Sequence, residues 1–236
     1  FTRLMHGRLV LFDIDGTLID TRGAGLKAIR MAVHDLHGAE VPKLDLNGAT
    51  DSGLARDILS SFDLEVNEKS VSAFYEAYLV RLAEHLGNGD FAGVILPGVP
   101  RLLDALREAG ATLGLLTGNI AAGADLKLEH FGLAEYFGFG AFGDDHHDRN
   151  ELGPVAVARA EEMQGRSFDR AETVIIGDTP KDIACGKALG AITLAVATGS
   201  FTVEELRDHH ATMVVENFDD PVRIVSGLRR DPHKGN

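Results

Sequence analysis

Short apolar runs rich in β-branched residues, separated by helical patterns, are the feature that most restricts the fold. The runs occupy residues 8–14, 112–117, 173–177 and 192–196, with a weaker run at 212–215. Nearly continuous apolar strands of this length are typical of parallel sheets that are covered on both faces. Helical patterns occupy residues 99–109, 121–131, 154–163, 180–189 and 203–209. This alternation predicts right-handed crossovers and an α/β fold with an open, doubly wound parallel sheet.

One stretch interrupts the alternation. Between the first strand and residue 99 the patterns are helical only, at residues 23–37, 51–62 and 68–86. A connection in a compact α/β fold is normally a few residues plus one helix, so this stretch is too long for a simple crossover. We therefore expect an inserted helical domain at residues 20–95, and a core formed by residues 1–19 and 96–236. The two junctions would leave the same edge of the sheet and act as a hinge.

Polar side chains follow three of the predicted strands, at the edge where an open parallel sheet binds its ligands. They are Asp13, Asp15, Thr117, Asn119, Asp178 and Asp182. Carboxylates that converge on one point need a cation to offset their charge. Hard oxygen ligands favour Mg²⁺, which proteins usually bind through a few carboxylates, waters and substrate phosphate. The pattern predicts a magnesium site, with Gly16 allowing the backbone to turn sharply behind the first two acids.

A site for an anion is predicted beside the acids. Thr117, Gly118 and Asn119 offer a hydroxyl and backbone N–H groups at the start of a predicted helix, which favours an anion. The chain has 23 Lys and Arg against 36 Asp and Glu, a formal net charge of −13. A surface this acidic repels a phosphate backbone, so we expect no nucleic-acid partner. A phosphate site must then bring its own positive charge, from a metal ion or a local Arg or Lys.

Cysteine usage and hydropathy indicate the compartment. The single cysteine, Cys185, excludes an internal disulfide framework and fits a reducing environment. No apolar run approaches the roughly 18 residues that span a bilayer, and the first residues lack the pattern of a signal peptide. We expect a cytoplasmic protein with no membrane partner; the sequence makes no prediction of its oligomeric state.

Three strings carry a resemblance to a known family: DIDGTL at residues 13–18, LLTGN at 115–119 and IIGDTPKD at 175–182. In this order they resemble the haloacid dehalogenase (HAD) superfamily of phosphohydrolases, whose core is Rossmann-like. The predicted insert is similar in position and size to that superfamily's helical C1-type cap. Residues 47–59 (NGATDSGLARDIL) are similar to the cap of its phosphoglycolate-phosphatase-like branch.

The resemblance implies a role for each acid. Asp13 would be the nucleophile that forms an aspartyl-phosphate. Asp15 would be the general acid for the leaving oxygen and then the base that activates water. Thr117 would hold a phosphoryl oxygen. Asp178 would ligate Mg²⁺ together with Asp13 and the backbone carbonyl of Asp15, and Asp182 would ligate through water or orient the basic residue.

The sequence departs from the family at that basic residue. Family members often carry Lys-Pro before the helix upstream of the third strand, whereas this chain has DRNELGP with Arg149 at the corresponding place. We expect Arg149 to bind the phosphate, because arginine can do so bidentately. The other candidate is Lys127, for which we expect a packing or surface role. A surface salt bridge is the alternative for Arg149, a helix N-cap for Thr117 and a first-turn helix acid for Asp182.

An acid at position 15 indicates phosphate-ester chemistry, because the dehalogenase and phosphonate-cleaving branches lack one there. The resemblance implies a Mg²⁺-dependent phosphatase for a small phosphorylated metabolite such as phosphoglycolate, since a closing cap excludes polymers. A β-phosphoglucomutase-like phosphosugar mutase would use the same residues. The third alternative is a non-catalytic phosphate- or metabolite-binding module, against which the intact set of acids argues. Candidate substrate contacts in the cap are Thr50, Asp51 and Arg56, with helix capping the alternative for the first two.

Overall fold

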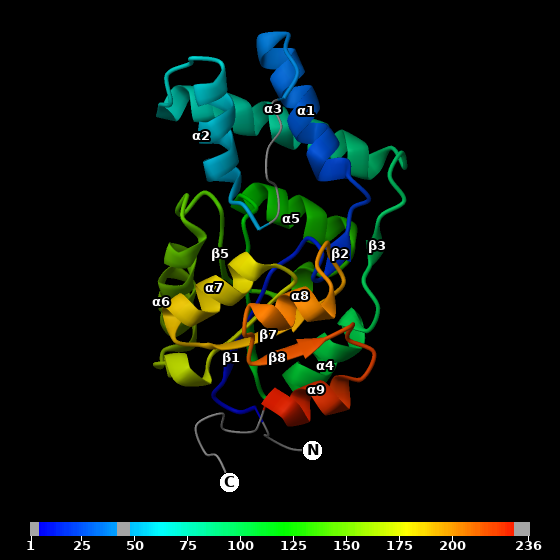
Figure 1. Ribbon diagram of the computed structural model, residues 1–236, viewed down its shortest axis with the longest axis vertical. Helices are drawn as coiled ribbons and strands as arrows, with labels where there is room; N and C mark the ends of the chain where they lie inside the picture. The colour runs from blue at the N-terminus through cyan, green and yellow to red at the C-terminus, as the bar shows by residue number, and fades with distance from the viewer. Residues whose placement is uncertain (1–4, 42–47, 229–236) are drawn as a thin grey trace.

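The computed structural model describes residues 5–41 and 48–228, and its core is a parallel sheet (Figure 1). The strand order is β5-β4-β1-β6-β7-β8. The strands are β1 (Leu9–Phe12), β4 (Thr112–Leu116), β5 (Gly140–Ala141), β6 (Val174–Gly177), β7 (Ile192–Val196) and β8 (Met213–Val215). Strand β1 lies in the middle, where Leu11 is in register with Gly114 of β4 and Ile175 of β6. The predicted doubly wound parallel sheet is confirmed.

Helices cover both faces of this sheet. Successive side chains of a buried strand point to opposite faces, so each face carries apolar side chains that a layer of helices must bury. The helices are α4 (Val99–Glu108), α5 (Ala121–His130), α6 (Leu152–Gln164), α7 (Pro180–Leu189), α8 (Val203–Asp208) and α9 (Pro221–Leu228). Val10 and Phe12 pack in one cluster with side chains of α4, α5 and α9. Leu9 and Leu11 pack in another with side chains of α6 and α7. The sequence predicts all of these helices except α9.

Three further helices lie beyond the carboxyl ends of the strands, at the top of Figure 1. They are α1 (Ala24–His37), α2 (Asp51–Ser61) and α3 (Glu68–Gly87). They share a cluster of buried side chains that includes Ala28, Ile58 and Phe74, and this cluster reaches Ile120 at the start of α5. No helix in the described part of the chain is both long and apolar enough to cross a membrane.

A two-stranded antiparallel ribbon joins these helices to the core. It consists of β2 (Ile19–Asp20) and β3 (Val94–Ile95), with Ile19 opposite Ile95 and Asp20 opposite Val94. The sequence predicts two junctions here but not their pairing, because runs of two residues carry no periodic signal. The expected domain boundary at 19/20 falls between the two residue pairs of the ribbon, and the boundary at 95/96 falls directly after β3. That residues 20–95 form a separate domain stays a prediction.

Candidate active site

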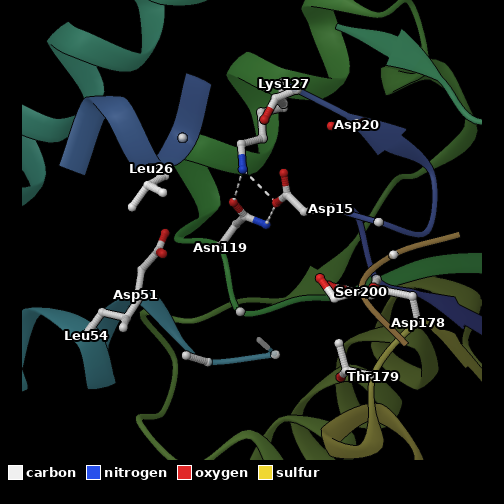
Figure 2. A pocket seen from close by; sticks show the side chains of 18 of the residues that line it. Asp15, Asp20, Leu26, Asp51, Leu54, Asn119, Lys127, Asp178, Thr179 and Ser200 are labelled. Atoms are coloured by element: carbon white, nitrogen blue, oxygen red, sulfur yellow. Dashed lines mark hydrogen bonds and ion pairs between the residues drawn. The ribbon is translucent and has the colours of Figure 1, made fainter. Parts of the chain in front are cut away.

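A cavity of about 440 Å³ lies between the carboxyl ends of the strands and helices α1–α3 (Figure 2). Most of the residues that the sequence predicts for the site line it. These are Asp13, Asp15, Gly16, Asp51, Gly118, Asn119, Arg149 and Asp178. The fold thus brings together residues from three strand ends, from helix α2 and from the turn before α6.

Arg149 connects two of the predicted acids. Its guanidinium Nη2 lies 3.0 Å from Asp13 Oδ1 and 2.5 Å from Asp182 Oδ1, and all three side chains are buried. Asp182 also accepts the Thr179 N–H in a capping box that begins α7, so it is both a first-turn acid and the partner of Arg149. The alternative of a surface salt bridge for Arg149 is excluded. Arg149 Nε is buried with no hydrogen-bond partner among the described residues.

The pKa values reflect this crowding of buried charge. Burial raises the pKa of Asp13 to about 6, although the nearby Arg149 opposes the rise. Burial alone would lower the pKa of Arg149, but Asp182 and Asp13 raise it above its ordinary value, so the guanidinium stays charged. The pKa of Asp178 lies well above its ordinary value because of burial and of the neighbouring Asp182 and Asp13. Arg149 therefore does not balance all three carboxylates.

The acidic cluster fits a divalent cation. Asp13, Asp178 and Asp182 each offer an oxygen atom, and these atoms lie within 4.8 Å of one another. Asp182 is committed to Arg149, whereas Asp178 accepts a single hydrogen bond from the described side chains, from Thr17 Oγ1 at 3.2 Å. Gly16 has a positive φ of 76°, and a Cβ atom there would overlap the Asp178 carboxylate. The backbone thus leaves room around buried acids that lack enough positive charge, which is the setting that hard cations occupy.

Lys127 reaches the centre of the site from α5. Its Nζ lies 2.6 Å from Asp15 Oδ2 and 2.6 Å from Asn119 Oδ1. Dashed lines mark both contacts in Figure 2. Asn119 Nδ2 in turn donates to Asp15 Oδ2 at 2.8 Å. The predicted packing or surface role of Lys127 is therefore wrong: its side chain is only 4% exposed and its amine faces the cavity. The face of α5 that carries Lys127 is covered by helices of the α1–α3 group, and a helical pattern in the sequence does not show this.

Thr117 lies behind the cavity wall rather than at the start of a helix. It is fully buried, and its Oγ1 accepts a hydrogen bond from Asn119 Nδ2 at 2.8 Å. The N-cap of α5 is Ile120, so the N-cap alternative for Thr117 is wrong. The first amides of α5 are also taken: Ile120 N–H donates to Asp51 Oδ2 and Ala121 N–H to Asp144 Oδ1. An anion at this edge would instead contact the Gly118 N–H and the two cations that line the cavity, Lys127 and Arg149.

The three cap residues differ in where they point. Asp51 lines the cavity, and its backbone N–H donates to Gly118 O at 2.7 Å, which ties α2 to the core. Thr50 is the N-cap of α2 and donates to His147 O, so it has the capping role that was its alternative. Arg56 is exposed and does not line the cavity. Residue 47, the first of the cap segment, lies outside the described residues.

Comparison with known proteins identifies the family. Residues 10–196 match the model of the haloacid dehalogenase-like hydrolases. The chain belongs to this family. It is 30% identical over 231 residues to N-acetylmuramic acid 6-phosphate phosphatase of Pseudomonas aeruginosa, covering 96% of each chain. It is 25% identical over 213 residues to phosphoglycolate phosphatase of Agrobacterium fabrum, covering 89% of this chain and 88% of the relative.

A solved structure shares the fold. A β-phosphoglucomutase from Clostridium difficile superposes with a TM-score of 0.71 at 18% identity, covering 93% of this chain and 96% of that one. At this identity the likeness concerns the fold alone. The match extends to residues of α1–α3, because it leaves only 7% of this chain uncovered.

Several residues that line the cavity were not predicted from the sequence. They are Asp20, Thr21, Gly25, Leu26, Ile29, Gly48, Ala49, Leu54, Tyr78, Thr179, Thr198, Gly199 and Ser200. Lys127 also lines the cavity, although a packing or surface role was expected for it. Thr198 donates to Gly16 O at 2.6 Å and belongs to the loop after β7. That loop also follows a parallel strand, so the rule about strand ends could have found it. The residues of α1, α2 and α3 face the cavity only through tertiary packing and carry no comparable signal.

Proposed function

We propose that this HAD hydrolase is a Mg²⁺-dependent phosphatase that cleaves a small phosphomonoester through an aspartyl-phosphate on Asp13. The observation that carries the proposal is the pair of acids at the end of β1. Asp13 contacts the Arg149 guanidinium, and Asp15, two residues on, is held by Lys127 and Asn119. In this proposal Asp13 would react beside a cation that binds the phosphoryl group, and Asp15 would transfer protons at the cavity.

The reaction would take two steps. First, an Asp13 carboxylate oxygen attacks phosphorus, the bond to the ester oxygen breaks, and Asp15 gives its proton to the departing alcohol. Second, Asp15 takes a proton from a water whose oxygen attacks phosphorus, and the bond between Asp13 and phosphorus breaks. Arg149 and the Gly118 N–H would bind the phosphoryl oxygens, with Thr117 supporting them from behind.

Asp13, Asp178 and the backbone carbonyl of Asp15 would hold the Mg²⁺. The ion supplies charge that offsets a phosphate dianion among carboxylates and stabilises the charge of the transferring phosphoryl group. Residues 20–95 would act as a cap hinged at the β2–β3 ribbon. With α1–α3 over the cavity, the substrate would be a small metabolite; the relatives named as phosphoglycolate phosphatases put phosphoglycolate among the compounds to test.

Phosphate release from a panel of phosphomonoesters tests the proposal, with Mg²⁺ and with EDTA. We expect release that requires Mg²⁺ and is lost in Asp13→Asn. The matched control Asp125→Asn, at an exposed position on α5, keeps the wild-type rate. A sugar phosphate that rearranges without free phosphate indicates a mutase. Equal ligand binding with no turnover in wild type and in Asp13→Asn indicates a binding module, and either result overturns the phosphatase.

A further inference from the structure

One end of the cavity is built by side chains that the proposed reaction does not use. They come from α1, α2 and α3 and are Leu26, Ile29, Asp51, Leu54 and Tyr78. Figure 2 shows Leu26, Asp51 and Leu54 at one end of the cavity, and Asp178 and Ser200 at the other, with Asp15 between them. With phosphate bound near Asp13 and Asp178, this end would receive the alcohol part of the ester.

Asp51 presents a hydrogen-bond acceptor to that end. Its Oδ2 accepts the Ile120 N–H at 2.9 Å, while Oδ1 has no hydrogen bond among the described residues. A carboxylate with one fixed oxygen has one preferred orientation, so its second oxygen is a pre-organised acceptor. An ionised carboxylate accepts hydrogen bonds and donates none.

Tyr78 adds an unpaired phenol. The side chain is 2% exposed and lines the cavity, yet its hydroxyl has no hydrogen-bond partner in the part of the chain that the structure describes. Buried tyrosine hydroxyls are usually hydrogen-bonded. Burial, followed by Asp51 and Asp15, raises the pKa of Tyr78 well above its ordinary value, so the phenol stays protonated. A bound ligand would supply the partner that the protein does not.

The charges of the lining disfavour a second anionic group on the substrate. Among the described lining residues the acids are Asp13, Asp15, Asp20, Asp51 and Asp178, and the cations are Lys127 and Arg149. Arg149 pairs with Asp13 and Asp182, and Lys127 pairs with Asp15. A substrate carboxylate at the end of the cavity lined by α1–α3 would therefore lie beside the Asp51 carboxylate. Among these lining residues, no cation is left without an acidic partner to pair with it. Like charges placed together are a common means of rejecting the wrong ligand.

We propose that the substrate is the phosphate ester of a small alcohol whose far end carries a hydrogen-bond donor, hydroxyl or ammonium, and no carboxylate. Asp51 is the acceptor for that donor and Tyr78 is the second polar contact. The alcohol's carbon atoms pack against Leu26, Ile29 and Leu54. The proposal rests on the phosphatase function, whose substrate class it narrows.

A series of three esters that differ only in the far group tests it. They are phosphoglycolate, ethylene glycol monophosphate and phosphoethanolamine, with p-nitrophenyl phosphate as a general phosphatase substrate. We expect kcat/KM for the hydroxyl or the ammonium ester to exceed that for phosphoglycolate at least about tenfold. If the hydroxyl ester has the highest kcat/KM, the hydrogen bond with Tyr78 contributes most to selection. If the ammonium ester has the highest kcat/KM, its attraction to the Asp51 carboxylate contributes most. Both results support the proposal.

Substitution at Asp51 identifies the residue responsible. Asp51→Asn keeps an oxygen for the Ile120 N–H and turns the free acceptor into a donor. The ratio of kcat/KM for phosphoglycolate to that for ethylene glycol monophosphate should rise at least about tenfold. Tyr78→Phe, which removes only the hydroxyl, should raise KM for the hydroxyl ester more than it lowers kcat. The control Asp57→Asn, at an exposed position of the same helix, leaves the ratio unchanged.

The failures of the two proposals are distinguishable. If phosphoglycolate is the best of the three esters and Asp51→Asn does not change the ratio, the substrate class is wrong and the phosphatase stands. If no ester releases phosphate, p-nitrophenyl phosphate included, the phosphatase function is wrong and the substrate class falls with it.

Discussion

Lys127 Nζ lies 2.6 Å from Asp15 Oδ2, and the two side chains differ sharply in exposure, at 4% for the lysine and 41% for the aspartate. A buried cation thus holds a carboxylate that faces the open cavity. Asn119 bonds to both side chains and links them to Thr117. The arrangement orients one Asp15 oxygen, which proton transfer to or from a small group requires.

Removing this cation should slow the reaction most for alcohols that leave poorly. We expect Lys127→Met to lower kcat/KM for an alkyl phosphate at least about tenfold, because general acid catalysis contributes roughly 10²–10⁴-fold. The loss should be smaller for p-nitrophenyl phosphate, whose leaving group needs little protonation. Steady-state kinetics with both esters measure the difference. The control Lys69→Met, at an exposed position of α3, has no effect; equal losses for both esters would contradict a role through Asp15.

Arg149 should be needed for stability as well as for activity. Arg149→Met leaves Asp13 and Asp182 buried without their cation, which should destabilise the fold by about 3–5 kcal/mol. Arg149→Lys restores a charge that can lie near both carboxylates but not the planar guanidinium with its several N–H donors, so stability should recover more than activity. Urea unfolding and phosphate release measure the two effects. Arg101→Met breaks an exposed ion pair with Asp219 and should change neither appreciably; a similar loss there would contradict the account.

Removing Mg²⁺ should lower the stability of the fold more at pH 7.5 than at pH 5. Burial raises the pKa of Asp13 to about 6 and that of Asp178 well above its ordinary value. A carboxyl whose folded pKa exceeds its unfolded one stabilises the fold below the unfolded pKa of about 4 and loses this contribution as pH rises through the folded pKa. We expect Mg²⁺ to raise the melting temperature more at pH 7.5 than at pH 5. Asp178→Asn should stabilise the EDTA-treated protein and abolish the Mg²⁺ effect; a Mg²⁺ effect that is equal at both pH values would contradict this.

Selection by Asp51 should weaken in acid. Burial raises the pKa of Asp51 to about 6, although Lys127 on α5 opposes the rise, and Asp15 and Asp144 face the same carboxyl. Below that pH a protonated Asp51 can donate to a substrate carboxylate. The preference for ethylene glycol monophosphate over phosphoglycolate should therefore grow from pH 5 to pH 7.5. The measurement is the ratio of kcat/KM for the two esters, in which the titration of groups that act on both esters equally cancels. A ratio that does not change with pH in the wild type would contradict the assignment to Asp51. A ratio that rises with pH equally in Asp51→Asn would contradict it too.

Residues that follow strands were predictable, and residues that depend on how helices pack were not. Asp13, Asp15, Thr117 and Asp178 each end a buried strand, and the parallel sheet brings such ends to one edge. Arg149 was predictable from the resemblance because it stands at a motif position before a helix.

Lys127 and Tyr78 carry no such signal. Each lies inside a helix, and each faces the cavity because α1–α3 are placed over α5. The β2–β3 ribbon was missed for a related reason: two residues per strand form a ladder only when both junctions lie side by side. Long-range packing decides these features, and local periodicity does not report it.

The most direct test of the account is to locate the phosphoryl group on the protein during turnover. Wild-type protein is incubated with Mg²⁺ and a phosphomonoester, quenched in acid and mapped by peptide mass spectrometry. The account predicts one phosphoryl group on Asp13, absent in Asp13→Asn and absent with EDTA. Phosphate release by Asp13→Asn at the wild-type rate, or a phosphoryl group on another residue, would contradict it.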